Sequence, residues 1–212
     1  MRYRRPKDYE QKLKDLTDKG ILCAEFEPND RDLYVEIGMG RGDFLTEYAQ
    51  RFGENFYLGI EKQAPLLILA GQKVEEKNLS NVRLMSFDAG KIDEMLPAGS
   101  VSKIFLNFSD PWSKQRYSKR RLTHLQMLQK YANISKQQAS LAIKTDNLDF
   151  FEFSISQIKQ SDYKIVREIR DIYSEENQRI LSADEPIYIQ TEYEKKFISL
   201  KKAIFSLECI RI

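Results

Sequence analysis

A short stretch near the middle of the chain, NFSDPWSKQRYSKRR at residues 107–121, combines residue types that could carry out chemistry. Asp110 follows the apolar run KIFLNF, so the spacing predicts a carboxylate at the end of a buried strand. Five basic residues with no acid among them come next: Lys114, Arg116, Lys119, Arg120 and Arg121. Clustered basic residues are typical of surfaces that bind phosphate backbones. The stretch therefore predicts chemistry on a polyanionic substrate.

A glycine-rich turn, VEIGMGRGDF, supplies a second candidate site. It contains Gly38, Gly40 and Gly42. Glycine permits a tight turn and lets a ligand approach the backbone, and the helix expected next offers free N–H groups. The turn therefore predicts a nucleotide-like cofactor. Glu36, which precedes the glycines, could contact that cofactor or only fix the turn by accepting backbone hydrogen bonds.

Two further acids follow the next predicted strands. Glu61 in YLGIEK is placed to accept hydrogen bonds from ribose hydroxyls, and Asp88 in SFDAG could accept from an adenine amino group. An acid in such a place can also be a simple helix cap. Taken in order with the glycine turn, these acids outline an adenosine pocket.

Alternating strands and helices would position these groups. Apolar, β-branched or aromatic runs predict strands at residues 33–37, 56–60, 82–87, 103–108 and 140–145. Helical spacing occurs between and after them, at residues 43–52, 63–77, 121–132 and 147–160. Such alternation predicts an α/β fold with a mostly parallel, doubly wound sheet covered on both faces. Later runs at 163–169 and 201–210 lack a regular crossover helix and predict an antiparallel edge.

Length and composition set the remaining expectations. The chain has 212 residues and no Pro/Gly/Ser-rich linker, which predicts one domain at 29–212 behind a basic, mobile arm at 1–28. Cys23 and Cys209 form no CxxC pair, so we expect reduced thiols and no metal site. No window approaches about 18 uninterrupted apolar residues, which predicts a cytoplasmic protein with no membrane partner.

The acid followed by GxGxG resembles motif I of the class I, S-adenosylmethionine-dependent methyltransferases. Three separated motifs, the stretch at 107–121, KTDN at 144–147 and TEYEKKF at 191–197, together resemble the bacterial tRNA (guanine-N7)-methyltransferase family. This resemblance extends over nearly the whole chain. It implies a Rossmann-like class I methyltransferase fold, S-adenosylmethionine as methyl donor, and tRNA as partner. It further implies methylation of N7 of the guanine at tRNA position 46, in the variable loop, by a monomer or homodimer without a metal.

The resemblance also implies roles for individual residues, with Asp110 at the catalytic centre. The implied cofactor contacts are Glu36, Gly38, Gly40, Gly42, Glu61, Asp88 and Asp110. The implied substrate contacts are Lys114, Asp146, Thr191, Glu192, Tyr193 and Glu194. The implied RNA contacts are Arg116, Tyr117, Ser118, Lys119, Arg120 and Arg121.

The chain departs from the family pattern PWPKKRH at three positions. Ser113 replaces the second proline, Gln115 a lysine and Tyr117 a histidine. These changes bear on the path of the RNA-binding loop and not on the catalytic acid. Tyr117 could stack on a base or merely cover the helix beneath it.

The expected chemistry needs orientation more than proton transfer. Guanine N7 has a lone pair and no proton at neutral pH, so in-line attack on a sulfonium methyl group requires no strong general base. The site must orient the base and place negative charge near a purine ring that becomes cationic. Carboxylates of Asp110, Asp146 and Glu194 could hold the guanine N1–H and exocyclic amine.

Other interpretations remain open. The basic run could be a solvated helix start, His124 an ordinary helix residue, and Asp146 or Asn147 a helix N-cap. TEYEKKF has little apolar content, so we expect more than a structural role for it. A second enzymatic function would be methylation of a base amino group in RNA or DNA, whose enzymes carry [DN]PP[FYW] where this chain has SDPW. A third would be RNA binding with a degenerate cofactor pocket.

Overall fold

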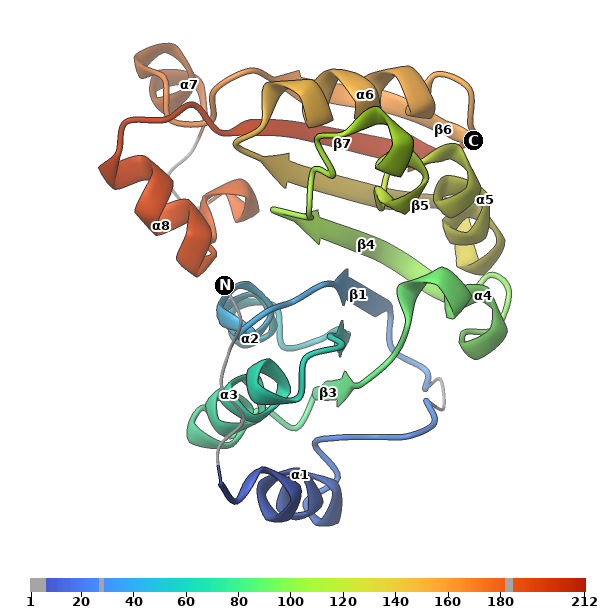
Figure 1. Cartoon of the computed structure of the whole chain (residues 1–212), viewed down its shortest axis with the longest axis vertical. Helices are drawn as coiled ribbons and strands as arrows, with labels where there is room; N and C mark the ends of the chain where they lie inside the picture. Colours follow the sequence, from blue (N-terminus) through green and yellow to red (C-terminus); the bar gives the residue numbers. More distant parts are fainter. Residues whose placement is uncertain (1–6, 27–28, 182–184) are drawn as a thin grey trace.

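A seven-stranded sheet runs through the molecule in a computed structural model (Figure 1), which describes all residues except 1–6, 27–28 and 182–184. The strands are β1 (Leu33–Ile37), β2 (Phe56–Ile60), β3 (Val82–Met85), β4 (Val101–Asn107), β5 (Ser135–Thr145), β6 (Tyr163–Ile169) and β7 (Phe205–Arg211). They lie in the order β3-β2-β1-β4-β5-β7-β6, and among the described strands only β7 runs against its neighbours. The predicted mostly parallel sheet with antiparallel pairing by the last strands is confirmed.

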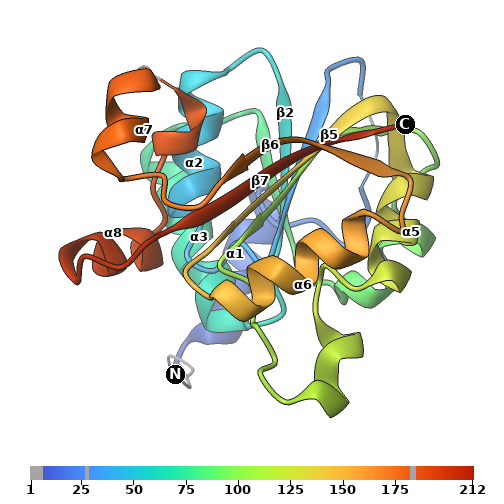
Figure 2. The same ribbon diagram turned by 90° about the horizontal axis from the view of Figure 1, so that it is seen from above.

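Helices cover both faces of this sheet (Figure 2). One face carries α1 (Tyr9–Asp18), α2 (Asp43–Arg51) and α3 (Ala64–Glu76). The other carries α4 (Ile92–Met95), α5 (Leu125–Ile134) and α6 (Leu148–Ile158). Each layer forms its own apolar cluster with the strands, which is why the parallel strands read as apolar on both faces. The remaining helical segments are short: η1 (Ala89–Lys91), η2 (Gln115–Arg120), α7 (Glu175–Ile180), η3 (Pro186–Tyr188) and α8 (Glu192–Ser199).

The N-terminal segment differs from the mobile arm expected at residues 1–28, whose first six residues lie outside the described part of the chain. Helix α1 packs on α3, and Leu16 of α1 fills the space that a side chain at Gly71 of α3 would occupy. Leu22 then forms a parallel β-bridge with Leu84 of β3. The described segment from α1 to this bridge is thus part of the folded domain. The sequence predicts α1 only weakly, because few apolar residues of this charged helix make its contacts with the domain.

A smaller unit between β6 and β7 lies beside the C-terminal ends of the parallel strands. The arrowheads of β4 and β5 point toward α8 (Figure 1). This unit has its own apolar cluster, whose buried members are Ile169, Ile172, Ile187 and Ile204. The sequence did not predict its helices α7, η3 and α8. Each is eight residues long or shorter, which leaves too few turns for a periodic signal.

Candidate active site

A cavity of about 270 Å³ opens at the edge where β1 and β4 end. Its lining includes seven residues that the sequence singled out: Glu36, Gly38, Gly40, Asp110, Thr191, Glu192 and Tyr193. Eight further residues line it: Met39, Arg41, Asp43, Phe44, Gln63, Leu66, Asn107 and Phe108. The fold therefore brings the glycine turn, the end of the NFSDPW stretch and the TEYEKKF segment to one place.

The three glycines of the turn have two different roles. All three have positive φ, at 75°, 58° and 72° for Gly38, Gly40 and Gly42, in the left-handed region that favours glycine. A Cβ at Gly38 or Gly40 would meet nothing within 4 Å, so these two leave open space beside the backbone. A Cβ at Gly42 would lie 2.9 Å from Cβ of Ala70 in α3. Gly42 thus serves the packing of α2 on α3 and does not line the cavity.

Glu36 is buried at the floor of the cavity, with 1% of its surface exposed. Its Oε1 accepts a hydrogen bond from Nδ2 of Asn107 at 2.8 Å, whereas Oε2 accepts none within the described residues. Burial raises the pKa of the Glu36 carboxyl to about 8, although the Asn107 hydrogen bond and the Lys144 charge act in the opposite direction. The carboxyl therefore keeps its proton at neutral pH until a cation comes close.

The role of fixing the turn belongs to Glu61. Its Oε2 accepts from the Gly40 N–H at 3.2 Å and its Oε1 from the Gln63 N–H at 2.9 Å. Asp88 caps η1 through the Gly90 N–H at 2.9 Å and pairs with Lys62 at 2.9 Å. This Lys62 ammonium, followed by the Gly90 N–H, holds the pKa of Asp88 below its ordinary value. Neither acid lines the cavity, so their contact with an adenosine remains a prediction.

Asp110 is exposed at the rim of the cavity, on a loop that a buried arginine holds in place. Arg121 is only 5% exposed, and its guanidinium donates to the carbonyls of Pro111 at 2.8 Å and Trp112 at 3.2 Å. Two non-glycine residues of this loop have left-handed backbones, Phe108 at φ 51° and Trp112 at φ 42°. Such strain persists only where the surroundings fix it. Arg121, expected as an RNA contact, is instead a support of the loop that presents Asp110.

Two other basic residues of the stretch, Arg116 and Arg120, are exposed and lie over half-buried aromatic rings. The Arg120 guanidinium lies 5.0 Å from the ring of Trp112 and 4.8 Å from that of Tyr117, and Arg116 lies 4.9 Å from Tyr117. We call these four residues the cation–aromatic cluster. It follows Asp110 directly along the chain. Bases stack on such rings and guanidinium planes, and phosphates pair with the charges.

Glu194 lies outside the cavity despite belonging to the TEYEKKF motif. Thr191 and Glu194 form a capping box that starts α8, in which each side chain binds the other's backbone N–H. The Glu194 carboxylate is fully buried and pairs with Lys144 at 3.1 Å. The expectation that Glu194 touches the substrate does not fit this geometry, because its carboxylate already pairs with Lys144 and with the first backbone N–H of the capping box. The motif thus has a structural role through Thr191 and Glu194, and residues 191–193 of the same motif also line the cavity.

Two further predicted substrate contacts, Lys114 and Asp146, do not line the cavity, so their contact with a substrate remains a prediction. Lys114 is exposed at the start of η2, and Asp146 is half-buried after β5. Asn147, one of the two N-cap candidates, caps α6 by accepting from the Phe150 N–H at 2.8 Å. Asp146 is thereby left for another role. His124 has a structural role as the N-cap of α5, where its Nδ1 accepts from the Gln126 N–H at 3.3 Å, and it lies just before that helix rather than within it as predicted, because α5 begins at Leu125 and not at residue 121.

Sequence reasoning missed several lining residues that stand inside its own motifs. Met39 and Arg41 alternate with the glycines, and Asn107 and Phe108 precede Asp110. Their position inside the motifs could have predicted that they line the site. The role of Asn107 as a hydrogen-bond donor to Glu36 could not be predicted, because it depends on the pairing of β1 with β4. Arg41 also pairs with Glu192 at 2.8 Å, which joins the glycine turn to α8.

The cavity has an excess of acidic groups. Its described lining has four carboxyl groups, on Glu36, Asp43, Asp110 and Glu192, against one cationic side chain, Arg41. Asp43 is paired with Lys73 at 2.6 Å and Glu192 with Arg41 at 2.8 Å, and Glu36 is protonated at neutral pH, so the net negative charge of the described lining comes from Asp110. Such a surface favours a ligand that carries positive charge beside its polar groups.

Comparison with known proteins agrees with this site. A family described as "Putative methyltransferase" matches residues 30–207. A tRNA (guanine-N(7)-)-methyltransferase of Ureaplasma parvum serovar 3 is 43% identical over 183 residues, which are 85% of this chain and 80% of that protein. One of Alkaliphilus metalliredigens is 35% identical over 208 residues, 96% of this chain and 92% of its own. The chain belongs to the tRNA (guanine-N7-)-methyltransferase family.

The fold of this tRNA (guanine-N7-)-methyltransferase family member also resembles solved structures. A SAM dependent methyltransferase from Aquifex aeolicus matches with a TM-score of 0.57 and 17% sequence identity, over 98% of this chain and 95% of that one. This likeness concerns the fold alone, and it confirms the Rossmann-like class I methyltransferase architecture. Within the described ranges, no helix combines the length and apolarity needed to cross a membrane, and no three His, Cys, Asp or Glu side chains group as metal ligands.

Proposed function

We propose that the protein transfers the methyl group of S-adenosylmethionine to N7 of guanine in tRNA, at position 46 of the variable loop. One observation carries the proposal beyond family membership: Asp110 stands at the rim of an acid-lined cavity and directly precedes the cation–aromatic cluster. A methyl donor on one side and a polyanion on the other would meet at this carboxylate. We further propose a cytoplasmic location and a monomer or homodimer.

The residues present fit S-adenosylmethionine. Its sulfonium and ammonium groups are cations, and the cavity offers Oε2 of Glu36, which accepts no hydrogen bond from the described part of the chain, together with the carboxylate of Asp110. The open space at Gly38 and Gly40 lets a ligand approach the backbone. Glu61 and Asp88 are the proposed partners of the ribose and the adenine. When bound, this cofactor supplies an electrophilic methyl group.

The chain's own groups orient the guanine. Asp110 and Asp146 are the proposed acceptors for its N1–H and exocyclic amine, since the Glu194 carboxylate is buried and paired. Negative charge there also stabilises the purine ring as it becomes cationic in the transition state. Lys114 and the cation–aromatic cluster would hold neighbouring phosphates and bases. No side chain has to remove a proton, because guanine N7 attacks through a lone pair.

The test is methyl transfer from labelled S-adenosylmethionine to unmodified tRNA, with nucleoside analysis and mapping of the product. We expect 7-methylguanosine in the variable loop. Label on a base amino group would favour the alternative enzyme, and failure to bind S-adenosylmethionine would favour the RNA-binding interpretation.

A matched pair of variants tests the guanine contacts. Asp146→Asn should lose methyl transfer while keeping affinity for S-adenosylmethionine. Asp149→Asn, an exposed acid in the first turn of α6, should retain activity. Unchanged activity of Asp146→Asn would refute the role given to Asp146.

A further inference from the structure

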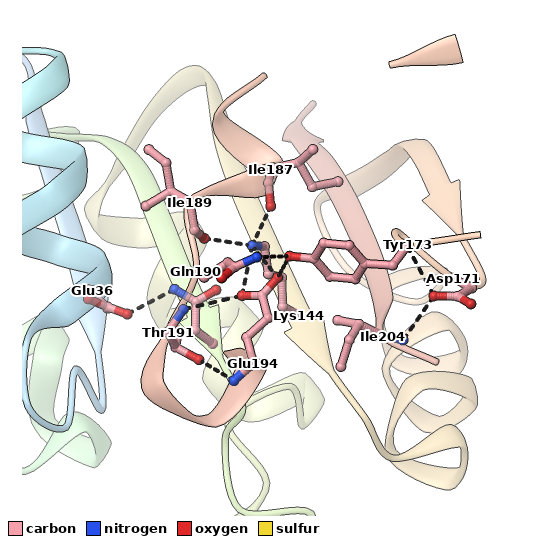
Figure 3. Close-up of polar contacts among 11 residues, drawn as sticks. Glu36, Lys144, Asp171, Tyr173, Ile187, Ile189, Gln190, Thr191, Glu194 and Ile204 are labelled. Atoms are coloured by element: carbon pink, nitrogen blue, oxygen red, sulfur yellow. Dashed lines mark hydrogen bonds and ion pairs between the residues drawn. The ribbon is translucent and has the colours of Figure 1, made fainter. Parts of the chain in front are cut away.

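A buried polar group joins the end of β5 to the segment that walls the cavity. Lys144 of β5 and Glu194 of α8 form an ion pair in which the Lys144 ammonium lies 3.1 Å from both carboxylate oxygens (Figure 3). The Tyr173 hydroxyl donates to Oε1 of Glu194 at 2.7 Å, and the Thr191 N–H donates to Oε2 at 3.3 Å. We call these four residues the clasp.

Lys144 binds the same segment at two more points. Its ammonium donates to the carbonyl of Ile189 at 3.0 Å and also to that of Ile187 (Figure 3). The side chain is 6% exposed and that of Glu194 is fully buried. One lysine of the central sheet thus holds three successive parts of the chain, η3, the turn after it and α8. Removing one partner of a buried pair leaves an uncompensated charge, which is strongly destabilising.

The clasp leaves Glu194 no free edge for a ligand. Each carboxylate oxygen accepts two hydrogen bonds, one from Lys144 and one from Tyr173 or the Thr191 backbone. A guanine would have to displace these donors and enter a site from which solvent is excluded. Glu194 can therefore affect the reaction only through what it holds.

What it holds is one wall of the cavity. Thr191, Glu192 and Tyr193, which directly precede Glu194, all line the cavity. The Lys144 ammonium also lies 5.7 Å from the ring of Phe44, another lining residue. On the outer side, Phe197 of α8 stacks on Phe108 of the Asp110 loop, with ring centroids 6.0 Å apart. Movement of α8 would thus alter both the cofactor side and the substrate side of the site.

We propose that Lys144 and Glu194 are positioning residues, whose buried pair holds residues 191–193 in place as a wall of the active site, and that Glu194 does not touch the substrate. Where it concerns methyl transfer, this inference rests on the proposed function. If the clasp is broken, fewer molecules have the wall in place at any moment. Apparent affinity falls with that fraction, whereas the rate at saturation is largely kept, because ligand binding selects the formed site.

The experiment compares Lys144→Met, Glu194→Gln, the double variant with both changes, and Tyr173→Phe, which keeps both charges and removes one hydrogen bond. The control is Lys164→Met, an exposed lysine of the edge strand β6. Hydrogen exchange is measured along the chain, together with S-adenosylmethionine affinity and the KM and kcat of methyl transfer.

We expect amide exchange in residues 186–199 to accelerate at least tenfold in each charge variant, with the β1 to β4 amides unchanged. KM should rise at least tenfold and kcat should change less than threefold. Compared with Glu194→Gln, the double variant should exchange its amides more slowly in residues 186–199 and should have a lower KM, because no unpaired charge remains. Tyr173→Phe should show the same pattern at smaller size, and the control should show none of it.

Other outcomes overturn the proposal. A Glu194→Gln variant with normal exchange but a kcat lowered at least tenfold, not recovered in the double variant, would make Glu194 a direct substrate contact. If the charge variants do not fold, unchanged exchange and KM in Tyr173→Phe would refute the clasp. If the wild-type protein does not methylate tRNA, the proposed function fails. The hydrogen exchange and the S-adenosylmethionine affinity of the variants still test whether the clasp holds residues 191–193 in place.

Discussion

Cofactor binding should release a proton from Glu36. The carboxyl lies beside Asn107 at the cavity floor, and its Oε2 has no partner within the described residues. Burial raises its pKa to about 8, so about 0.9 of the molecules are protonated at pH 7. The sulfonium and ammonium of S-adenosylmethionine favour the ionised form, and the proton leaves as they arrive. Affinity should then rise about ninefold from pH 6 to pH 7.

Calorimetry in buffers of different ionisation heat counts the protons. We expect about 0.9 proton released per bound cofactor at pH 7 for the wild-type protein, and close to none for Glu36→Gln, whose affinity should be lower and independent of pH over this range. Glu47→Gln is the matched control on α2. Its carboxyl is already ionised, since hydrogen bonds from Arg51 and then Lys77 hold the pKa of Glu47 below its ordinary value. The same proton count in Glu36→Gln and the wild-type protein would refute the reasoning.

The same carboxyl should affect the stability of the ligand-free protein. Its pKa is 4.5 in the unfolded chain and about 8 in the folded one, so the folded state binds more protons between these values. Its contribution is fully present below pH 4.5 and is lost as pH rises toward 8. The free energy of unfolding should fall by up to about 1.4 kcal/mol per pH unit in that window. Glu36→Gln should lack this slope in denaturant titrations at several pH values.

Three further substitutions distinguish residues that stabilise the fold around the site from residues that contact the tRNA. Arg121→Met should lower the free energy of unfolding by about 2–3 kcal/mol and reduce kcat, because two loop carbonyls lose a charged donor; normal kcat would contradict its supporting role. Arg120→Met should leave stability unchanged and reduce the slope of log affinity for tRNA against log salt by about 0.7–0.9; an unaltered slope would exclude a phosphate contact. Gly42→Ala should cost about 2–4 kcal/mol in denaturant unfolding, because the contact of its Cβ with Ala70 adds to the cost of the left-handed φ, whereas Gly99→Ala, at similar φ in open space, should cost only about 1 kcal/mol; equal costs would show that packing plays no part.

The sheet was predictable because its signal is local. Runs such as LYVEI and FYLGI are apolar on both faces, which only a strand covered on two sides requires, and they became β1 and β2. Boundaries were less accurate where a strand continues into polar sequence. β5 begins at Ser135, five residues before the predicted start, because the buried Ser135 pairs with Val101 of β4; the exposed residues 136–138, where the register with β4 shifts, carry no apolar signal.

The charged residues of the motifs were harder to interpret, because the function of a charge depends on its partner in space. Arg120 and Arg121 are adjacent, yet Arg120 is exposed over two aromatic rings, whereas Arg121 is buried and binds loop carbonyls ten and nine residues earlier. Glu194 lies within a run that otherwise lines the cavity, and its partner Lys144 is 50 residues away in the sequence. A pattern shows that a group is needed at a position and does not show whether it touches the ligand. For both residues, burial supplies the missing distinction: a charge that is paired and removed from solvent stabilises the site, and only its exposed neighbours remain to bind the substrate.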